Sequence, residues 1–250
     1  GKNNVDIIDQ RVFLVLSATY PLAIIYSLVP LRESYFLFGI GLLLIGVMKN
    51  KPFNIYLIFG LVITILMRIP YIMYILFILF FKYTYNFKYR FFLYLILLPI
   101  FFILAELLSQ NIINNSLTPE GLASFRNYQG TLREGPGGYP PVNWTNWLDV
   151  IFYFPKLFLQ FLVAPLPVIV KIDFWTKYAY FADGLFVVFI VVMLLFNNKK
   201  IRKYKFWIFN IFIFISLTCM FEYFLTGAVR HRYPAILMML PMLSSLYKFK

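Results

Sequence analysis

The sequence predicts an all-α fold: a polytopic integral membrane bundle of about 8 membrane helices, with one further interfacial or re-entrant helix on the outer face. Composition is the first reason, because 62% of the residues are hydrophobic and only 13% are charged, which is far from the ordinary globular balance. Aromatic residues are the second, since they make up 21% of the chain and suit a lipid-facing surface with interfacial belts. The third reason is the alternation of apolar runs with short basic links.

Each apolar run is a candidate helix. The runs fall at about residues 12–30, 35–48, 53–67, 70–81, 91–108, 150–170, 179–196, 206–226 and 234–247. A helix that crosses the hydrocarbon layer of ~30 Å needs about 20 residues, so several of these helices are short. Residues 1–250 are taken as a single transmembrane domain. Because Gly1 is not an initiator methionine, we expect this domain to be the later part of a longer chain.

The stretch 53–81 can be read as one long helix or as two short ones. One long helix would place Arg68 in the middle of the bilayer, at a cost of about 2.5–3.5 kcal/mol or more. Pro70 also disfavours an uninterrupted helix. We therefore predict two short helices that turn back at residues 68–70. With that turn, and with residues 150–170 not crossing the membrane, the lysine-rich links all fall on one side, as expected for cytoplasmic loops. These links are residues 49–51, 82–90, 197–205 and 248–250.

Two segments are predicted to lie outside. Residues 109–147 form the one long polar stretch, and their Gly and Pro content predicts an ordered outer loop without regular elements. The segment 148–178 that follows is apolar but contains Pro155, Pro165 and Pro167. A clean membrane crossing is improbable with three prolines, so an interfacial or re-entrant helix fits this segment better.

Cations on the predicted outer side are mostly arginines, against the positive-inside trend. They are Arg32, Arg68, Arg126, Arg133, Arg230 and Arg232, beside Lys156, Lys171 and Lys177. The planar guanidinium grips phosphate or carboxylate oxygens with two parallel hydrogen bonds, which an ammonium group cannot do. The six arginines therefore predict an anionic ligand at the outer face, such as a sugar-bearing polyprenyl phosphate or diphosphate. The alternative is that they snorkel to lipid headgroups.

His231 is the only histidine, in the stretch "GAVRHRYP" at residues 227–234. Flanking cations favour a neutral imidazole that can accept a proton, so His231 is a candidate general base. Outer carboxylates compete for that role or pair with arginines, and we keep Glu33 and Glu134 as candidate catalytic residues. For Glu222, eight residues before Arg230, we predict ion pairing with an arginine. The alternative for His231 is a hydrogen-bonding interfacial residue.

The sequence offers no residue pattern for disulfide, metal or cofactor chemistry. Cys219 is the single cysteine, which excludes a disulfide framework or a cysteine-based metal site. We predict no metal or other cofactor and no nucleic-acid partner.

Several stretches resemble bacterial polysaccharide polymerases of the Wzy and EpsG-like type. "YPLAIIYSLVPLRESYFLFGIGLLLIGVMKNK" resembles their helix that opens at an arginine and runs inward to a basic turn, and "PFNIYLIFGLVITILMRIP" follows their returning short helix, with Arg68 in the turn. "FPKLFLQFLVAPLP" and "GAVRHRYPAILMMLP" are similar to segments of bacterial polysaccharide-biosynthesis membrane proteins. In the outer loop, Arg126 and Gly137 match the Arg-to-Gly spacing of the polymerases.

The resemblance implies a GT-C-like helical enzyme of the bacterial cytoplasmic membrane that joins polyprenyl-diphosphate-linked glycans at the outer face. In that reading the arginines hold the diphosphate of the glycan donor, and His231 or an outer carboxylate deprotonates the glycan acceptor. Polymerase and ligase remain alternatives. A lipid-linked oligosaccharide flippase or anion transporter, and a non-catalytic membrane scaffold, are the competing functions.

Overall fold

The computed structural model describes residues 10–21, 32–48, 54–67, 71–84, 103, 106, 107, 110, 116–131, 138–165, 174–197, 200 and 204–246. Within these residues the chain is α-helical, and its β-structure is limited to one isolated bridge between Gly138 and Phe224. The all-α fold class is therefore confirmed for this part of the chain.

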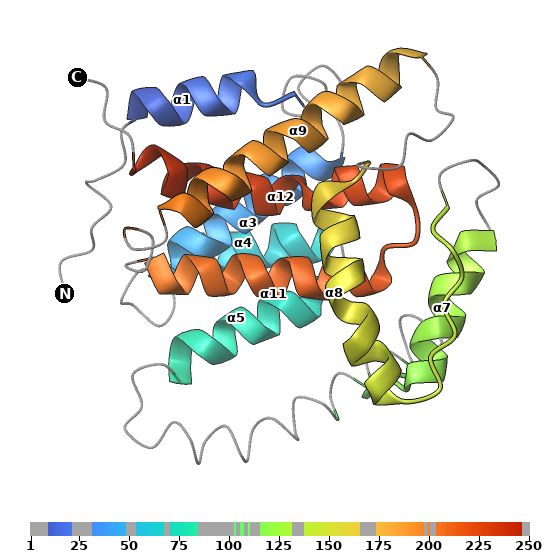
Figure 1. Ribbon diagram of the computed structural model, residues 1–250. Helices are drawn as coiled ribbons and strands as arrows, with labels where there is room; N and C mark the ends of the chain where they lie inside the picture. Colours follow the sequence, from blue (N-terminus) through green and yellow to red (C-terminus); the bar gives the residue numbers. More distant parts are fainter. Residues whose placement is uncertain are drawn as a thin grey trace. The chain divides into compact units, whose positions relative to one another are not determined.

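Most of the helices overlap an apolar run, and they are labelled in Figure 1. They are α1 (Gln10–Thr19), α3 (Arg32–Met48), α4 (Ile55–Met67), α5 (Ile72–Thr84), α7 (Pro119–Thr131), α8 (Trp147–Val163), α9 (Phe174–Phe196), α11 (Lys205–Phe221) and α12 (Leu225–Ser244). The run 91–108 lies almost entirely outside the described residues. The stretch 53–81 contains two helices, since α4 ends at Met67 and α5 starts at Ile72.

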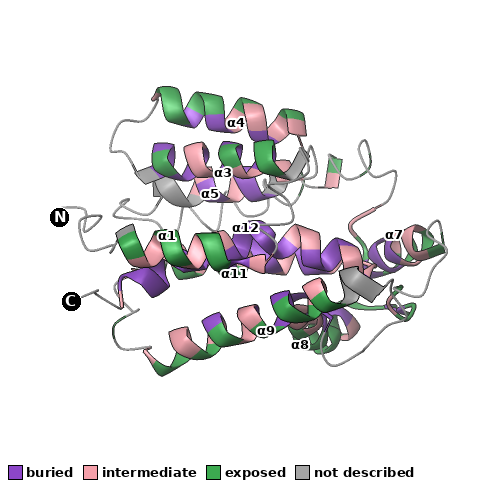
Figure 2. Ribbon diagram, turned by 90° about the horizontal axis from the view of Figure 1, so that it is seen from above, coloured by how far each residue is buried: buried purple, intermediate pink, exposed green. Residues whose placement is uncertain are grey.

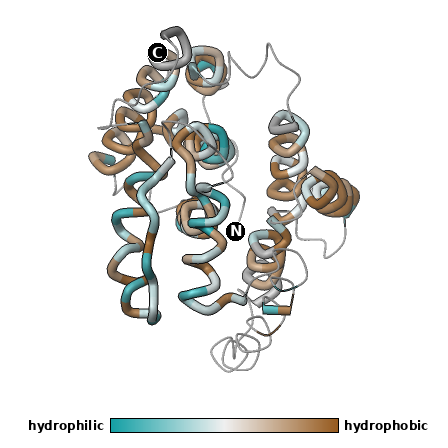
Figure 3. The backbone as a smooth tube through the Cα atoms, turned by 90° about the vertical axis from the view of Figure 1, so that its right-hand side faces the viewer, coloured by the Kyte–Doolittle hydropathy of each residue, from teal (hydrophilic) through white to brown (hydrophobic). Residues whose placement is uncertain are grey.

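One helix in the described part of the chain is long and apolar enough to cross a membrane, the stretch Tyr178–Phe196 of α9. The apolar helices Ser34–Val47, Ile55–Met67 and Trp207–Phe221 are shorter. A core helix of a soluble protein can pass the same test, but such a helix is mostly buried, whereas only 22% of the α9 stretch is buried. Hydrophobic residues dominate the helical tube in Figure 3. These features are consistent with membrane association.

The chain divides into two compact units. The first unit comprises Gly1–Val29, Gln129–Pro141 and Ile151–Lys250, and the second comprises Pro30–Tyr128 and Val142–Val150. In the first unit, α12 is the central helix and packs against α1, α9 and α11. Most of α12 is buried, and it is predominantly purple in Figure 2. Its neighbours keep exposed apolar residues, as Leu185 and Phe189 of α9 illustrate.

In the second unit, α3 and α4 pack through glycines. A Cβ atom on Gly60 of α4 would lie 2.3 Å from the backbone nitrogen of Leu43, and one on Gly46 of α3 would lie 2.5 Å from that of Leu57. Only a residue without a side chain permits backbones to approach this closely. Asn54 joins the same two helices, because its side chain donates to the Gly46 carbonyl and accepts from the Leu57 N–H.

The outer loop predicted at residues 109–147 contains a helix that the sequence reading missed. Helix α7 starts at Pro119, and its first turn is capped by Thr118, whose hydroxyl accepts from the Gly121 N–H at 3.1 Å. Thr at the N-cap, Pro at the first helical position and Glu120 next to it form a helix-start signal. The expectation of a loop without regular elements was therefore wrong for residues 119–131, because the overall Gly and Pro content masked this local signal.

The interfacial segment predicted at 148–178 begins with a real helix, α8, which contains Pro155. A cluster of large hydrophobic residues on α8 is exposed: Trp147, Leu148, Ile151, Phe152, Tyr153 and Leu159. Leu157 and Phe161 are instead buried. An apolar exposed face on a short helix is typical of an interfacial element.

Candidate functional site

The cluster Arg230–His231–Arg232 lies inside helix α12, about a turn and a half after its start at Leu225. The sequence reading placed it in a link before a helix at 234–247; that boundary was wrong, because α12 runs without interruption from Leu225 through Pro234. Successive residues of a helix point about 100° apart, so the three side chains face three directions. Their exposures differ accordingly: Arg230 is half-buried, His231 is 26% exposed and Arg232 is 0% exposed.

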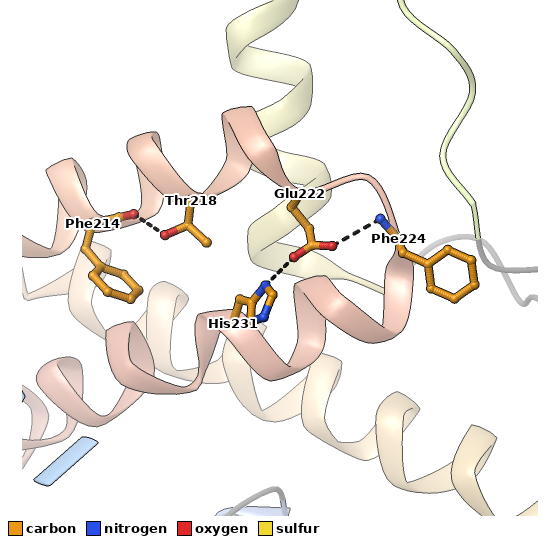
Figure 4. Close-up of polar contacts among 5 residues, drawn as sticks. All are labelled: Phe214, Thr218, Glu222, Phe224 and His231. Carbon is orange, nitrogen blue, oxygen red and sulfur yellow. Dashed lines mark hydrogen bonds and ion pairs between the residues drawn. The ribbon is translucent and has the colours of Figure 1, made fainter. Parts of the chain in front are cut away.

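His231 faces the corner between α11 and α12, where it meets Glu222 (Figure 4). The distance between His231 Nδ1 and Glu222 Oε2 is 2.5 Å, and the Glu222 side chain is only 4% exposed. The other carboxylate oxygen, Oε1, accepts from the Phe224 N–H at 3.1 Å. Both carboxylate oxygens are thus engaged, which fixes the side chain of Glu222 in one orientation. We call this pair the Glu222–His231 dyad.

Local sequence explains why the carboxylate can sit there. Helix α11 ends at Phe221, and the extended backbone of Glu222 turns the chain towards α12. A Cβ atom on Gly227 would lie 2.3 Å from Glu222 Oε1, so the glycine leaves room for the carboxylate in this position against the first turn of α12. The carboxylate also lies at the amino-terminal end of α12, where the helix dipole favours negative charge.

The dyad has the form of a base and its orienting group. When Nδ1–H donates to Glu222, the lone pair of a neutral imidazole is on Nε2, on the opposite edge of the ring. A buried carboxylate that holds Nδ1 in this way fixes the tautomer and stabilises the imidazolium formed when Nε2 takes a proton. The arrangement is therefore suited to general acid–base chemistry.

Arg230 adds a cation next to the dyad. It comes close enough to Tyr180 of α9 to interact electrostatically with the phenol. Arg230 directly precedes His231, so its guanidinium lies on an adjoining face of the same turn of α12. Such a pairing suits an anionic ligand with a hydroxyl to deprotonate.

Arg232 points the other way, into the first unit. It forms a salt bridge with Asp183 of α9, and both side chains are 0% exposed. Its second terminal nitrogen donates to the carbonyl of Leu162 at 3.0 Å, with the Phe161 carbonyl at 3.5 Å. These carbonyls belong to the last turn of α8, which has no intrahelical donor for them. Tyr20 packs over this pair and stacks on Tyr233, with ring centroids 5.3 Å apart.

The corner of the dyad is also joined to the segment that the sequence predicts as an outer loop. Gly138 forms the isolated bridge with Phe224, and the Tyr139 N–H donates to the Tyr223 carbonyl at 3.0 Å. The backbone just after Glu222 is therefore held by two neighbouring loop residues.

The remaining predicted site residues are placed as follows. Arg32 and Glu33 are the first two residues of α3 in the second unit, and their side chains are not among those described. Arg126 lies in α7 of the same unit and is only 3% exposed. Arg68, Arg133 and Glu134 lie outside the described residues. Among the described residues of the first unit, the predicted set is represented by Arg230, His231 and Arg232, which are neighbours because they are consecutive in α12.

Two carboxylates gain roles that the sequence reading did not give them. Glu222 was expected to pair with an arginine, and its partner is instead His231, nine residues later. Asp183 had no assigned role and is the partner of Arg232. Among the described residues, no group of three or more His, Cys, Asp or Glu side chains could hold a metal ion.

Comparison with protein-family models, with curated proteins and with solved structures finds no match for this chain.

Proposed function

We propose that this chain is a polytopic membrane glycosyltransferase that joins polyprenyl-diphosphate-linked glycans at the outer face of the membrane, as a polysaccharide polymerase or ligase. The observation that carries the proposal is the Glu222–His231 dyad at the corner between α11 and α12, with Arg230 on the same turn of α12. A carboxylate-oriented imidazole next to an arginine supplies both a base and an anion-binding group.

The proposed reaction is a displacement at the anomeric carbon of the donor glycan. His231 Nε2 removes the proton of an acceptor hydroxyl as the oxygen attacks that carbon. The bond between the anomeric carbon and the diphosphate oxygen breaks, and the polyprenyl diphosphate leaves with the electron pair. The proton stays on the imidazole, where Glu222 stabilises the positive charge.

Arg230 is the arginine best supported as a diphosphate ligand, because it adjoins the base and is half-buried. A guanidinium there would stabilise the negative charge that develops on the leaving group. Arg32, Arg68 and Arg133 remain predicted ligands, and Glu33 and Glu134 remain predicted alternatives to His231. We leave Arg126 and Arg232 out of the ligand-binding set, since their exposures of 3% and 0% keep them from the surface.

The proposal includes a topology of about 8 membrane helices in a bacterial cytoplasmic membrane, with α8 lying in the outer interface. The lysine-rich links would face the cytoplasm, and the α11–α12 corner would face outward. The single long apolar helix, the shorter apolar helices and the exposed apolar face of α8 support this arrangement.

A transporter is the second candidate, because the Asp183–Arg232 pair is buried within the candidate spanning helix α9 and its neighbour α12. Ionisable residues inside membrane segments commonly mark ion or substrate pathways. A transporter would move lipid-linked glycan without forming a glycosidic bond, so the two candidates differ in their product.

The test is conversion of lipid-linked repeat units into longer glycans by membranes with matched protein levels. We expect His231→Gln to lower the transfer rate about 10²-fold or more, the usual contribution of a general base. Arg230→Lys keeps the charge but loses the planar fork, and should lower the rate about tenfold. The control is Lys156→Gln, which removes an exposed cation of α8 far from the dyad in sequence. Full chain growth with His231→Gln would exclude the proposed mechanism.

A further inference from the structure

The Asp183–Arg232 pair stands next to the dyad in the chain but takes no part in the reaction proposed above. Arg232 directly follows His231, and its guanidinium contacts two different helices, α8 through backbone carbonyls and α9 through Asp183. The buried side chain of Arg232 thus joins α12 to α8 through two contacts and to α9 through one.

A buried ion pair of this kind is a poor choice for stability alone. Removing two charges from water costs several kcal/mol per ion, and apolar residues of similar volume often stabilise a protein equally well or better. The pair does fix the orientation of the Arg232 side chain, because a guanidinium forms hydrogen bonds with its partners only in a narrow geometry. The pair therefore restricts how α12 can rotate about its own axis.

Rotation of α12 matters for the neighbouring histidine. A turn of about 20° moves an atom at the side-chain radius of about 5–6 Å by about 2 Å. The contact between His231 and Glu222 is 2.5 Å long, so such a shift would break it. Misplacement of a catalytic group by about 1 Å can lower a rate about 10²-fold.

We propose, resting on the function above, that Asp183 and Arg232 are positioning residues: they lock the rotation of α12 and so hold the His231 imidazole against Glu222. The last turn of α8 shares in this lock through the carbonyls of Phe161 and Leu162. The interfacial helix and the base are thereby fixed to each other by the residue that follows the base.

The test uses the fact that His231 is the only histidine of the chain. Histidine labelled with ¹⁵N, in protein purified with a tag free of histidine, gives one imidazole, whose ring nitrogens report the tautomer and its hydrogen bond. We expect the wild type to show a single Nδ1–H tautomer with a strongly hydrogen-bonded proton. The variant Glu222→Gln removes the charged acceptor. Its spectrum therefore serves as the reference for a dyad that has been weakened directly.

The decisive variant replaces both charges, Arg232→Met with Asp183→Leu, and so leaves no buried charge unpaired. We expect the folded double variant to lose the single Nδ1–H tautomer and to show a mixture, as Glu222→Gln does. Glycan transfer should fall about tenfold to 10²-fold in parallel. The matched control is Ile236→Ala, which opens a cavity in the same helix at a fully buried position and should leave the tautomer unchanged.

Arg232→Lys is the second variant, used if the double variant does not fold. A lysine can hold Asp183 or the α8 carbonyls but not both in the same geometry, so a second tautomer should again appear. An unchanged His231 spectrum in whichever variant folds would overturn the positioning role. A changed spectrum without any glycan transfer in the wild type would instead leave the positioning role standing and exclude the proposed function.

Discussion

The two units of this chain hold their helices together by opposite means. In the second unit, α3 and α4 pack backbone to backbone through Gly46 and Gly60. In the first unit, α12 meets its neighbours through a fully buried charge pair, Asp183 and Arg232. Glycine contacts work through close approach alone, whereas the charge pair requires particular partners in a particular direction. The difference indicates that the second unit is built for close packing and that the first unit is built to set the direction of side chains.

The largest expected effect comes from removing one charge of the buried pair. Arg232→Ala leaves Asp183 buried without its cation and should lower the free energy of unfolding by about 3–5 kcal/mol. Arg232→Met with Asp183→Leu should be close to neutral in stability, because no charge is left unpaired. Thermal unfolding in detergent compares the two. Equal destabilisation by both variants would show that the pair acts by stabilising the fold and would remove the contrast between the units.

A smaller effect is expected at the glycine contacts, with a sign that depends on position. Gly60→Ala places its Cβ 2.3 Å from the Leu43 backbone nitrogen and should destabilise the protein by about 1–3 kcal/mol. Gly41→Ala is the matched control in the partner helix, since its Cβ meets nothing within 4 Å and should stabilise by about 0.5–1 kcal/mol. Thermal unfolding in detergent measures both changes in stability. A change of the same sign in the two variants would contradict close packing at Gly60. Neither variant should alter the His231 tautomer.

The smallest effect is expected at Asp149, whose carboxylate is more exposed than the buried carboxylate of Asp183. Asp149 accepts from the backbone N–H and hydroxyl of Thr145 and from the Asn146 N–H, which together lower its pKa below the ordinary value of 3.8. A lowered pKa means that this cap stabilises the folded state above the unfolded pKa and that the contribution is lost as pH falls through the folded pKa. Titration of the labelled Asp149 carboxyl carbon should show this directly. Asp149→Asn should remove that part of the acid dependence, and a midpoint at or above the ordinary value would refute the cap.

The parts of the fold that depend on local pattern could be predicted from the sequence. Hydrophobic length alone located the apolar part of α9, and Arg68 with Pro70 indicated the break between α4 and α5. Helix α7 was missed although Thr118 and Pro119 mark its start, because the Gly and Pro content of the whole loop was weighed above that local signal. The cap of α8 at Asn146 and Asp149 is a second local signal of this kind.

The candidate site depended on information that local patterns do not carry. The contact of Glu222 with His231 requires that α12 start at Leu225, ahead of the apolar run 234–247 from which this helix was predicted. The helix continues through Pro234 because packing by α1, α9 and α11 outweighs the lost hydrogen bond. The Asp183–Arg232 pair joins residues 49 positions apart, so only the tertiary structure could identify it. The arginine excess pointed to the right helix turn but did not distinguish the surface residue Arg230 from the core residue Arg232.

The bridge between Gly138 and Phe224 has a consequence for how this chain can diverge. It joins Gly138, and Tyr139 after it, to the backbone beside Glu222 through main-chain hydrogen bonds that any side chain allows. A Cβ atom on Gly138 would meet nothing within 4 Å, so a substitution there can be accepted without displacing the carboxylate. Related chains would be expected to vary at residue 138 while they keep the main-chain hydrogen bonds beside Glu222.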